Sequence, residues 1–134
     1  MNLDKLKKSF KAFTKTASNL VKDKEKTMKT VHDSIAKATA NKGALTQIWE
    51  QMQLLFSVAK DYANGSYTTI PKGSIVAIVA GLLYFISPLD LIPDFIAVFG
   101  FIDDAFILSL VYKQVAKDLE KYQAWKDKQN IIHI

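Results

Sequence analysis

Residues 73–89 carry no charged side chain, and those from Ile75 to Ile86 are all apolar or small. Such a stretch has to be shielded from water on every side, either by other helices of a bundle or by lipid. Its seventeen residues fall short of the roughly 20 that a helix needs to cross a bilayer. Ser87-Pro88 ends it, because proline disfavours helical geometry in the residue before it. The sequence therefore predicts a buried helix over residues 73–86.

Helical periodicity extends over most of the remaining chain. Over residues 44–63, apolar side chains recur every three or four positions and form one wide face, which Asn64-Gly65 closes. Asp103-Asp104 opens a last helix, which we expect to end in a charged tail around Trp125. The residues predicted to face inward from this helix are Phe106, Ile107, Leu110, Val111 and Val115.

The N-terminal segment has a helical pattern of its own. An apolar stripe steps by three and four residues, and lysines fill the other faces. The stripe loosens over residues 22–29, resumes weakly up to residue 38 and ends at Asn41-Lys42-Gly43, where we expect Gly43 to take a positive φ. The stripe consists of Leu3, Leu6, Phe10, Phe13, Ala17 and Leu20.

Together these segments predict an all-α fold. A chain of 134 residues suffices for one core of four or five helices, and 49% hydrophobic residues exclude general disorder. We expect a small bundle with a hydrophobic helical hairpin, along residues 73–89 and back along 95–112, and a short broken helix at 91–98. Residues 1–42 form the basic amphipathic segment and residues 43–134 the rest of a single structural unit.

The charge is concentrated at the N-terminus, where residues 1–42 hold eleven lysines against four acids. No basic residue is an arginine, so the forked hydrogen bonds typical of specific nucleic-acid recognition are absent. Attraction to anionic surfaces remains open. Without cysteine there is neither a disulfide nor a thiolate metal site, and His32 and His133 are far apart. No phosphate loop, HExxH motif or nucleophile with a nearby base is present, so the sequence favours a non-enzymatic protein without a firmly indicated cofactor.

A basic amphipathic helix with Leu and Phe on its other face is typical of a membrane-surface helix. The alternative is that the apolar stripe packs on the domain's own core or on a helix of a protein partner, as most amphipathic helices do. The residues predicted to contact a membrane are Leu3, Leu6, Lys7, Lys8, Lys11, Phe10 and Phe13.

A motif follows the apolar segment: Tyr84, then Ser87-Pro88-Leu89-Asp90-Leu91-Ile92-Pro93-Asp94, a short apolar run, Gly100 and Asp103-Asp104. It closely resembles the pattern of the YkvA-like family, a bacterial domain of unknown function, and every position of that pattern is filled. The likeness covers residues 67–115. It implies a helical domain often found in or against membranes, and no established activity.

Four aspartates, Asp90, Asp94, Asp103 and Asp104, stand in this otherwise apolar region. Asp90 and Asp103 suit helix caps, which accept backbone N–H bonds and are worth about 1 kcal/mol each. Alternatively, Asp90 and Asp94 share a helical face and meet Asp103 or Asp104 if the chain reverses at Gly100. Such an oxygen-only set favours Mg²⁺ or Ca²⁺. We expect Ser87, Pro88, Pro93 and Gly100 to have structural roles. Tight turns at Pro88, Pro93 and Gly100 should bring the four carboxylates together at one end of the helix 73–86.

The predicted function is that of a small, intracellular, membrane-associated helical protein, with an anionic membrane surface or a partner helix as its ligand. A two-span hairpin would carry Asp103 and Asp104 near mid-depth, at about 2.5–3.5 kcal/mol each. This cost favours peripheral association. The alternatives are a soluble cytoplasmic interaction module and a cation-binding domain.

Overall fold

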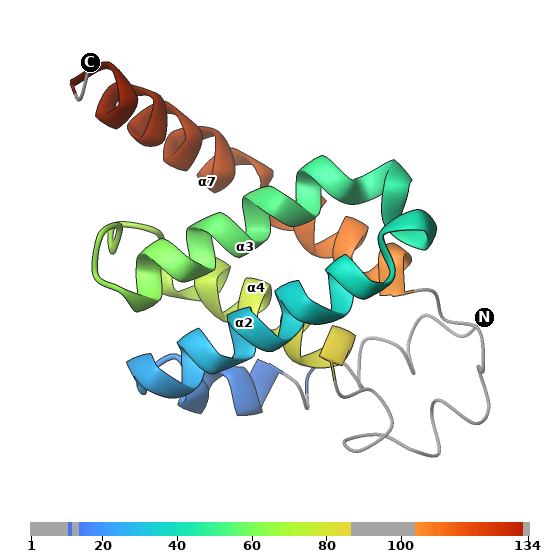
Figure 1. The fold of residues 1–134 in the computed structure, drawn as a ribbon. Helices are drawn as coiled ribbons and strands as arrows, with labels where there is room; N and C mark the ends of the chain where they lie inside the picture. The colour runs from blue at the N-terminus through green and yellow to red at the C-terminus, as the bar shows by residue number, and fades with distance from the viewer. Residues whose placement is uncertain (1–10, 12–13, 87–103, 133–134) are drawn as a thin grey trace.

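The computed structural model describes residue 11, residues 14–86 and residues 104–132. Residues 14–20 are helical, and no strand occurs in the described part of the chain, which confirms the all-α prediction. The further helices, in chain order, are α2 (Lys24–Ala40), the 3₁₀-helix η1 (Lys42–Ile48), α3 (Trp49–Ala63), α4 (Lys72–Ile86) and α7 (Asp104–Ile132) (Figure 1).

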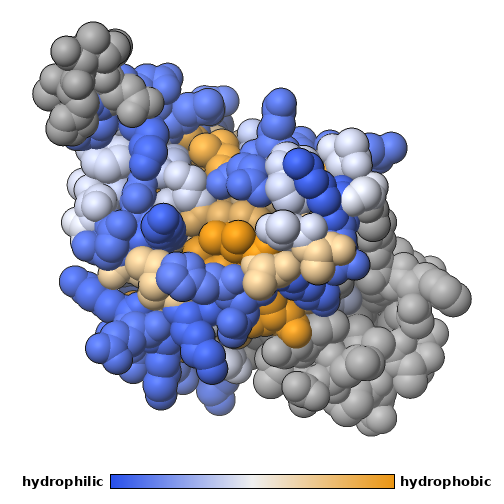
Figure 2. All heavy atoms as spheres, viewed as in Figure 1, coloured by the Kyte–Doolittle hydropathy of each residue, from blue (hydrophilic) through white to orange (hydrophobic). Residues whose placement is uncertain are grey.

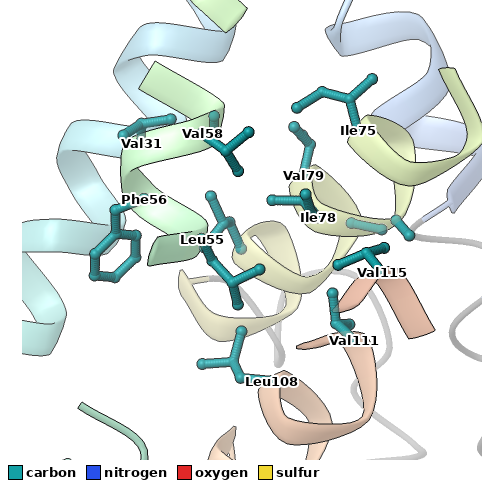
Figure 3. Packing of buried hydrophobic residues seen from close by; sticks show 14 of the residues in the cluster. Val31, Leu55, Phe56, Val58, Ile75, Ile78, Val79, Leu108, Val111 and Val115 are labelled. Atoms are coloured by element: carbon teal, nitrogen blue, oxygen red, sulfur yellow. The ribbon is translucent and has the colours of Figure 1, made fainter. Parts of the chain in front are cut away.

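The helix α4 forms the centre of the bundle, and α2, α3 and α7 pack around it (Figure 1). Its residues are buried without interruption from Ile75 to Leu82, so burial extends to every face of the helix. Leu55 of α3 and Val111 of α7 belong to the same apolar cluster (Figure 3). Burial of each Val, Leu or Ile side chain stabilises the folded state by about 1.5–3 kcal/mol. The side chains of α4 are therefore a large part of what stabilises the bundle. The prediction of a buried helix over residues 73–86 is confirmed.

The two arms of the predicted hairpin, α4 and α7, pack directly on each other. Gly81 lies at their contact, where an added Cβ would come within 3.1 Å of Val111 Cγ2 and 3.6 Å of Leu108 Cδ2. The missing side chain therefore allows α7 to approach α4 closely. The broken helix predicted at residues 91–98 lies outside the described residues.

The N-terminal segment is interrupted where its apolar stripe loosens. Residues 21–23 separate the helical residues 14–20 from α2, and Asp23 caps α2 by accepting a hydrogen bond from Lys26 N at 3.1 Å. Ala17 and Val21 are buried, and Leu20 packs against the core. The described end of the stripe is thus part of the domain's own core.

The prediction for Gly43 is wrong. Among the described residues, the positive φ belongs to Gly65, at 84°, in the turn that closes α3 as expected. Gly43 lies inside η1, because the chain runs from α2 directly into this 3₁₀-helix without the reversal that a positive φ would serve. Thr46 Oγ1 donates to the carbonyl oxygens of Lys42 and Gly43 and so supports the tight turn.

The inward face of α7 was also predicted incorrectly at one position. Leu110 is 42% exposed, whereas the buried residues of this helix are Leu108, Val111, Val115, Leu119 and Tyr122. Apolar residues occur here on several faces of the helix, and among the described elements α4 and α3 make most of the contacts with α7. The expected charged tail is helical, and Trp125 packs partly buried against the core.

Lys37 of α2 joins the basic segment to the end of α4. Its ammonium donates a hydrogen bond to the carbonyl oxygen of Phe85 and lies 4.8 Å from the centroid of the Phe85 ring. The last carbonyls of a helix lack intrahelical partners, and a cation there also complements the helix dipole. Lys37 therefore stabilises the end of α4, immediately before Ser87 and Pro88 of the motif.

Candidate functional site

Nearly all residues of the predicted cation site and of the motif lie outside the described residues. Asp104 is the first residue of α7, and only its backbone is described. Within the described ranges, no group of three or more His, Cys, Asp or Glu side chains is arranged to hold a metal ion. The cation site therefore stays a prediction. The residues outside are Ser87, Pro88, Asp90, Pro93, Asp94, Gly100 and Asp103.

Of the predicted membrane-contact residues, Lys11 is described, and it is exposed. The others, Leu3, Leu6, Lys7, Lys8, Phe10 and Phe13, lie outside the described residues. In the described part of the chain, no helix combines the length and the apolar character that a membrane crossing requires.

Exposed lysines gather on residues 11–29, and we call them the basic surface. This stretch holds six lysines and two acids, Asp23 and Glu25, and all six lysines are exposed. The corresponding part of the molecule, over residues 14–20 and the start of α2, is mostly hydrophilic in Figure 2. The basic surface consists of Lys11, Lys15, Lys22, Lys24, Lys26 and Lys29.

A buried polar network joins α3 to α7. The Asp61 side chain is 10% exposed, and its Oδ2 accepts hydrogen bonds from Tyr122 Oη at 2.6 Å and Lys126 Nζ at 3.0 Å. Tyr122 Oη also lies 2.5 Å from Ser57 Oγ. Because the tyrosine proton points to the carboxylate, the Ser57 hydroxyl is the donor in this second bond. Every member of the network therefore has a partner.

The network keeps Tyr122 protonated. Burial raises the pKa of Tyr122 well above its ordinary value, and the bond to the Asp61 carboxylate raises this pKa further. The bond from Ser57 has the opposite, smaller effect on it. A tyrosine with a raised pKa is a fixed hydrogen-bond donor and not a base, so the arrangement serves packing of α7 on α3.

Tyr122 also belongs to a cluster of three aromatic rings. The Tyr67 ring centroid lies 5.0 Å from that of Tyr122, edge to face, and 4.9 Å from that of Trp125. The rings of Tyr122 and Trp125 are stacked at 5.9 Å. Next to them is a cavity of about 380 Å³, which we call the aromatic cavity. It is lined by Tyr67, Thr69, Ile70, Pro71, Asp118, Lys121 and Trp125.

A second, more open hollow of about 570 Å³ runs between α3 and α7 on the other side of the network. Its lining is mostly amide and hydroxyl groups, with Glu50 as its one charged residue. Uncharged amides without a cationic, acidic or nucleophilic cluster do not define a chemical activity.

The polar network between α3 and α7 was not predicted from the sequence. The available signal was the spacing of Tyr122, Trp125 and Lys126, which places two aromatic side chains and one cationic side chain on a single helical face. A further signal is the acid Asp61, four residues after Ser57 and therefore on the same face of the helix. The partners are about 61 residues apart in the sequence, so only the fold reveals their pairing.

The fold and its surfaces define a small all-α bundle with a central helix that is buried on every face from Ile75 to Leu82, and with a basic N-terminal surface. Residues 74–110 match the family described as protein of unknown function (DUF1232). The chain is also similar to a protein of Bacillus subtilis (strain 168) described as "Uncharacterized membrane protein YkvA", with 35% identity over 77 residues. These residues make up 58% of this chain and 73% of that relative. No solved structure matches the chain significantly.

The chain belongs to the YkvA-like family. The matched residues 74–110 include the motif from Tyr84 to Asp104, so the resemblance expected from the sequence is confirmed. They also include α4 from Ser74 onwards and the first turns of α7, the two helices whose close contact centres on Gly81.

Proposed function

We propose that this domain is a non-enzymatic, peripheral membrane protein inside the cell, and that its basic surface binds anionic lipid headgroups. The observation that carries the proposal is the exposure of all six lysines of residues 11–29, against only two acids. The description of the Bacillus subtilis relative as a membrane protein supports the same assignment.

The magnitudes favour this function. A lysine near an anionic leaflet contributes about 1 kcal/mol, so six of them supply several kcal/mol without any apolar insertion. Lysine acts as a flexible point charge, which suits a fluid surface better than the fixed geometry of one specific ligand. The attraction decays over the Debye length, about 10 Å at 0.1 M salt and about 3 Å at 1 M. Binding that depends on the basic surface should therefore disappear at high salt.

The direct test is flotation of the purified protein with vesicles. We expect it to float with phosphatidylcholine vesicles containing 30% phosphatidylglycerol at 50 mM salt, and to remain in the lower fraction with pure phosphatidylcholine. Replacing Lys22, Lys26 and Lys29 by Gln should lower the affinity roughly 100-fold, on the estimate of about 1 kcal/mol per lysine.

The matched control replaces three exposed lysines of α7, Lys113, Lys117 and Lys128, by Gln and so makes the same change in net charge. We expect this variant to keep most of its vesicle binding. Equal losses in both triple variants would mean that net charge and not the basic surface is responsible. A wild-type protein that ignores anionic vesicles at low salt would overturn the proposal.

The state of the protein in cells supplies a second test. Carbonate extraction releases proteins that are held at a membrane surface and leaves spanning helices in the bilayer. We expect the native chain to sediment with membranes and to be released by carbonate. Retention after carbonate would instead support the two-span hairpin.

A second candidate function is a soluble interaction module. Its specific support is that Ala17, in the described end of the apolar stripe, and Val21, which follows the stripe, are buried in the domain's own core. In that case Leu6 and Phe13 should be protected from solvent without any vesicle, and Phe10→Glu or Phe13→Glu should destabilise the fold. For the membrane function, the same two substitutions should weaken vesicle binding and leave the melting temperature nearly unchanged.

A further inference from the structure

One end of the bundle brings together parts of the chain that are distant in sequence. The start of α2, residues 64–71 and the second half of α7 all lie at this end (Figure 1). Lys24 Nζ of the basic surface lies 4.0 Å from the position that a Cβ on Gly65 would take. Two residues further, Tyr67 begins the lining of the aromatic cavity. The basic surface and the aromatic cavity are therefore neighbours, joined by the turn at Gly65.

The walls of the aromatic cavity are held rigidly. Tyr67 and Trp125 form its aromatic wall, and both rings pack on Tyr122, which is fixed by its hydrogen bonds to Asp61 and Ser57. The Asp118 carboxylate is fixed as well, because it accepts a hydrogen bond from the Ser74 hydroxyl at the start of α4. A preformed pocket avoids the ordering cost that a flexible one would bear on binding.

The cavity contains one negative and one positive side chain. Asp118 and Lys121 are three residues apart on α7, so they are neighbours on its surface. Within the described residues, the ion pair that the structure contains is that of Lys126 with Asp61, and Asp118 and Lys121 are not bridged to each other. A ligand with a positive and a negative group can therefore bind both, and the aromatic faces beside them attract a cation.

We propose that the aromatic cavity binds a phosphate ester that carries a primary ammonium group, the chemistry of a phosphoethanolamine headgroup. The ammonium donates to the Asp118 carboxylate beside the rings of Tyr67 and Trp125, and the phosphate accepts from Lys121. This inference rests on the proposed function: the membrane-bound domain would have a site for a lipid headgroup next to its basic surface. The ligand is either the headgroup of a lipid or a soluble phosphate ester that carries the same two charged groups.

Trp125 provides the readout. The protein has two tryptophans, so Trp49→Phe leaves Trp125 as the only indole fluorophore. We expect its emission to change in a saturable way during titration with glycerophosphoethanolamine. Glycerol phosphate, which lacks the amine, and ethanolamine, which lacks the phosphate, should each bind at least about tenfold more weakly, because a charge-assisted hydrogen bond is lost in each case. The Trp125 indole N–H signal in NMR spectra of the wild type gives the same information without the substitution.

Matched variants test the two charged residues. Asp118→Asn keeps an acceptor for Ser74 but removes the negative charge, and Lys121→Gln removes the positive charge. Each should weaken glycerophosphoethanolamine binding at least about tenfold. The controls are Asp127→Asn and Lys117→Gln, exposed residues of the same helix that do not line the cavity. They should bind like the wild type.

The outcomes separate this inference from the proposed function. No response of Trp125 to millimolar glycerophosphoethanolamine, or equal affinity for glycerol phosphate, would overturn the headgroup site even if anionic vesicles still bind. A saturable response without vesicle binding would keep the site, make a soluble ester its ligand and overturn the membrane function. Stronger flotation when phosphatidylethanolamine is added to the anionic vesicles, lost in Asp118→Asn, would support both and identify the lipid as the source.

Discussion

The Tyr122 hydroxyl of α7 donates a hydrogen bond of 2.6 Å to the carboxylate of Asp61 on α3, across 61 residues of sequence. The same carboxylate oxygen accepts from Lys126, and the same hydroxyl accepts from Ser57. This one contact therefore connects four side chains and fixes how α7 lies on α3.

Replacing Tyr122 by Phe keeps the ring and removes the hydroxyl. Asp61 and Ser57 each lose a buried partner, so we expect the free energy of unfolding to fall by about 1–3 kcal/mol. Urea denaturation followed by circular dichroism measures this change. Tyr112→Phe, at a half-buried position of the same helix, is the control and should change stability much less. A Tyr122→Phe protein as stable as the wild type would show that the hydroxyl contributes nothing net.

Alkaline pH should destabilise the fold through Tyr122. Its pKa is raised in the folded protein, first by burial and then by Asp61, whereas in the unfolded chain it is about 10. The stabilisation is therefore fully present below pH ~10 and is lost as pH rises toward the folded pKa, because only the unfolded chain releases the proton. We expect the free energy of unfolding to decline more steeply between pH 10 and 11 in the wild type than in Tyr122→Phe. Parallel curves would contradict the raised pKa.

The two glycines of α4 should respond oppositely to alanine. Nothing lies within 4 Å of a Cβ at Gly73, so Gly73→Ala should stabilise the protein by about 0.5–1 kcal/mol through helix propensity. At Gly81 the added methyl would meet Val111 Cγ2 at 3.1 Å, and overpacking of about 1–3 kcal/mol outweighs that gain. Thermal melts of both variants measure the difference. Combining Gly81→Ala with Val111→Ala should remove the overpacking, and additive effects of the two changes would contradict a direct clash.

The motif aspartates can be tested although they lie outside the described residues. We expect these aspartates to have structural roles, with Asp90 and Asp103 as helix caps, so that Asp94→Asn changes the melting temperature only modestly and without any dependence on Mg²⁺ or Ca²⁺. A cation site would instead give a wild-type melting temperature that rises with free cation and an Asp94→Asn protein that does not respond. Titrations of both proteins with the two cations distinguish the possibilities. A cation-dependent rise in the wild type alone would establish the metal site.

The sequence was most informative where a residue pattern excludes exposure to water or requires a special backbone conformation. The uninterrupted run from Ile75 to Leu82 has no polar side to turn toward water, so the central position of α4 was predictable. The end of α3 at Asn64-Gly65 was predictable because a positive φ strongly favours glycine. The family motif was likewise recognisable, since its prolines, glycine and aspartates occur at fixed spacings.

The sequence was least informative where the outcome depends on a distant part of the chain. Leu110 and Val111 are equally apolar, and only the position of α4 decides that Val111 is buried and Leu110 exposed. Gly43 resembles a helix end, but the next residues continue as η1. Asp61 and Tyr122 are ordinary in their own segments and become a pair only when α7 crosses α3. Each of these outcomes depends on residues beyond the local helical turn.

The separation of Asp61 from Tyr122 also sets an order of events during folding. α2, η1 and α3 are consecutive and can associate through contacts that are local in sequence, which form fast. Asp61 emerges from the ribosome about 3–12 s before its tyrosine, at ordinary synthesis rates for 61 residues. Until α7 arrives, its carboxylate remains hydrated and the aromatic wall has only Tyr67. The end of the bundle that carries the aromatic cavity is therefore completed last, so we expect a chain stopped before α7 to form helices without forming this cavity.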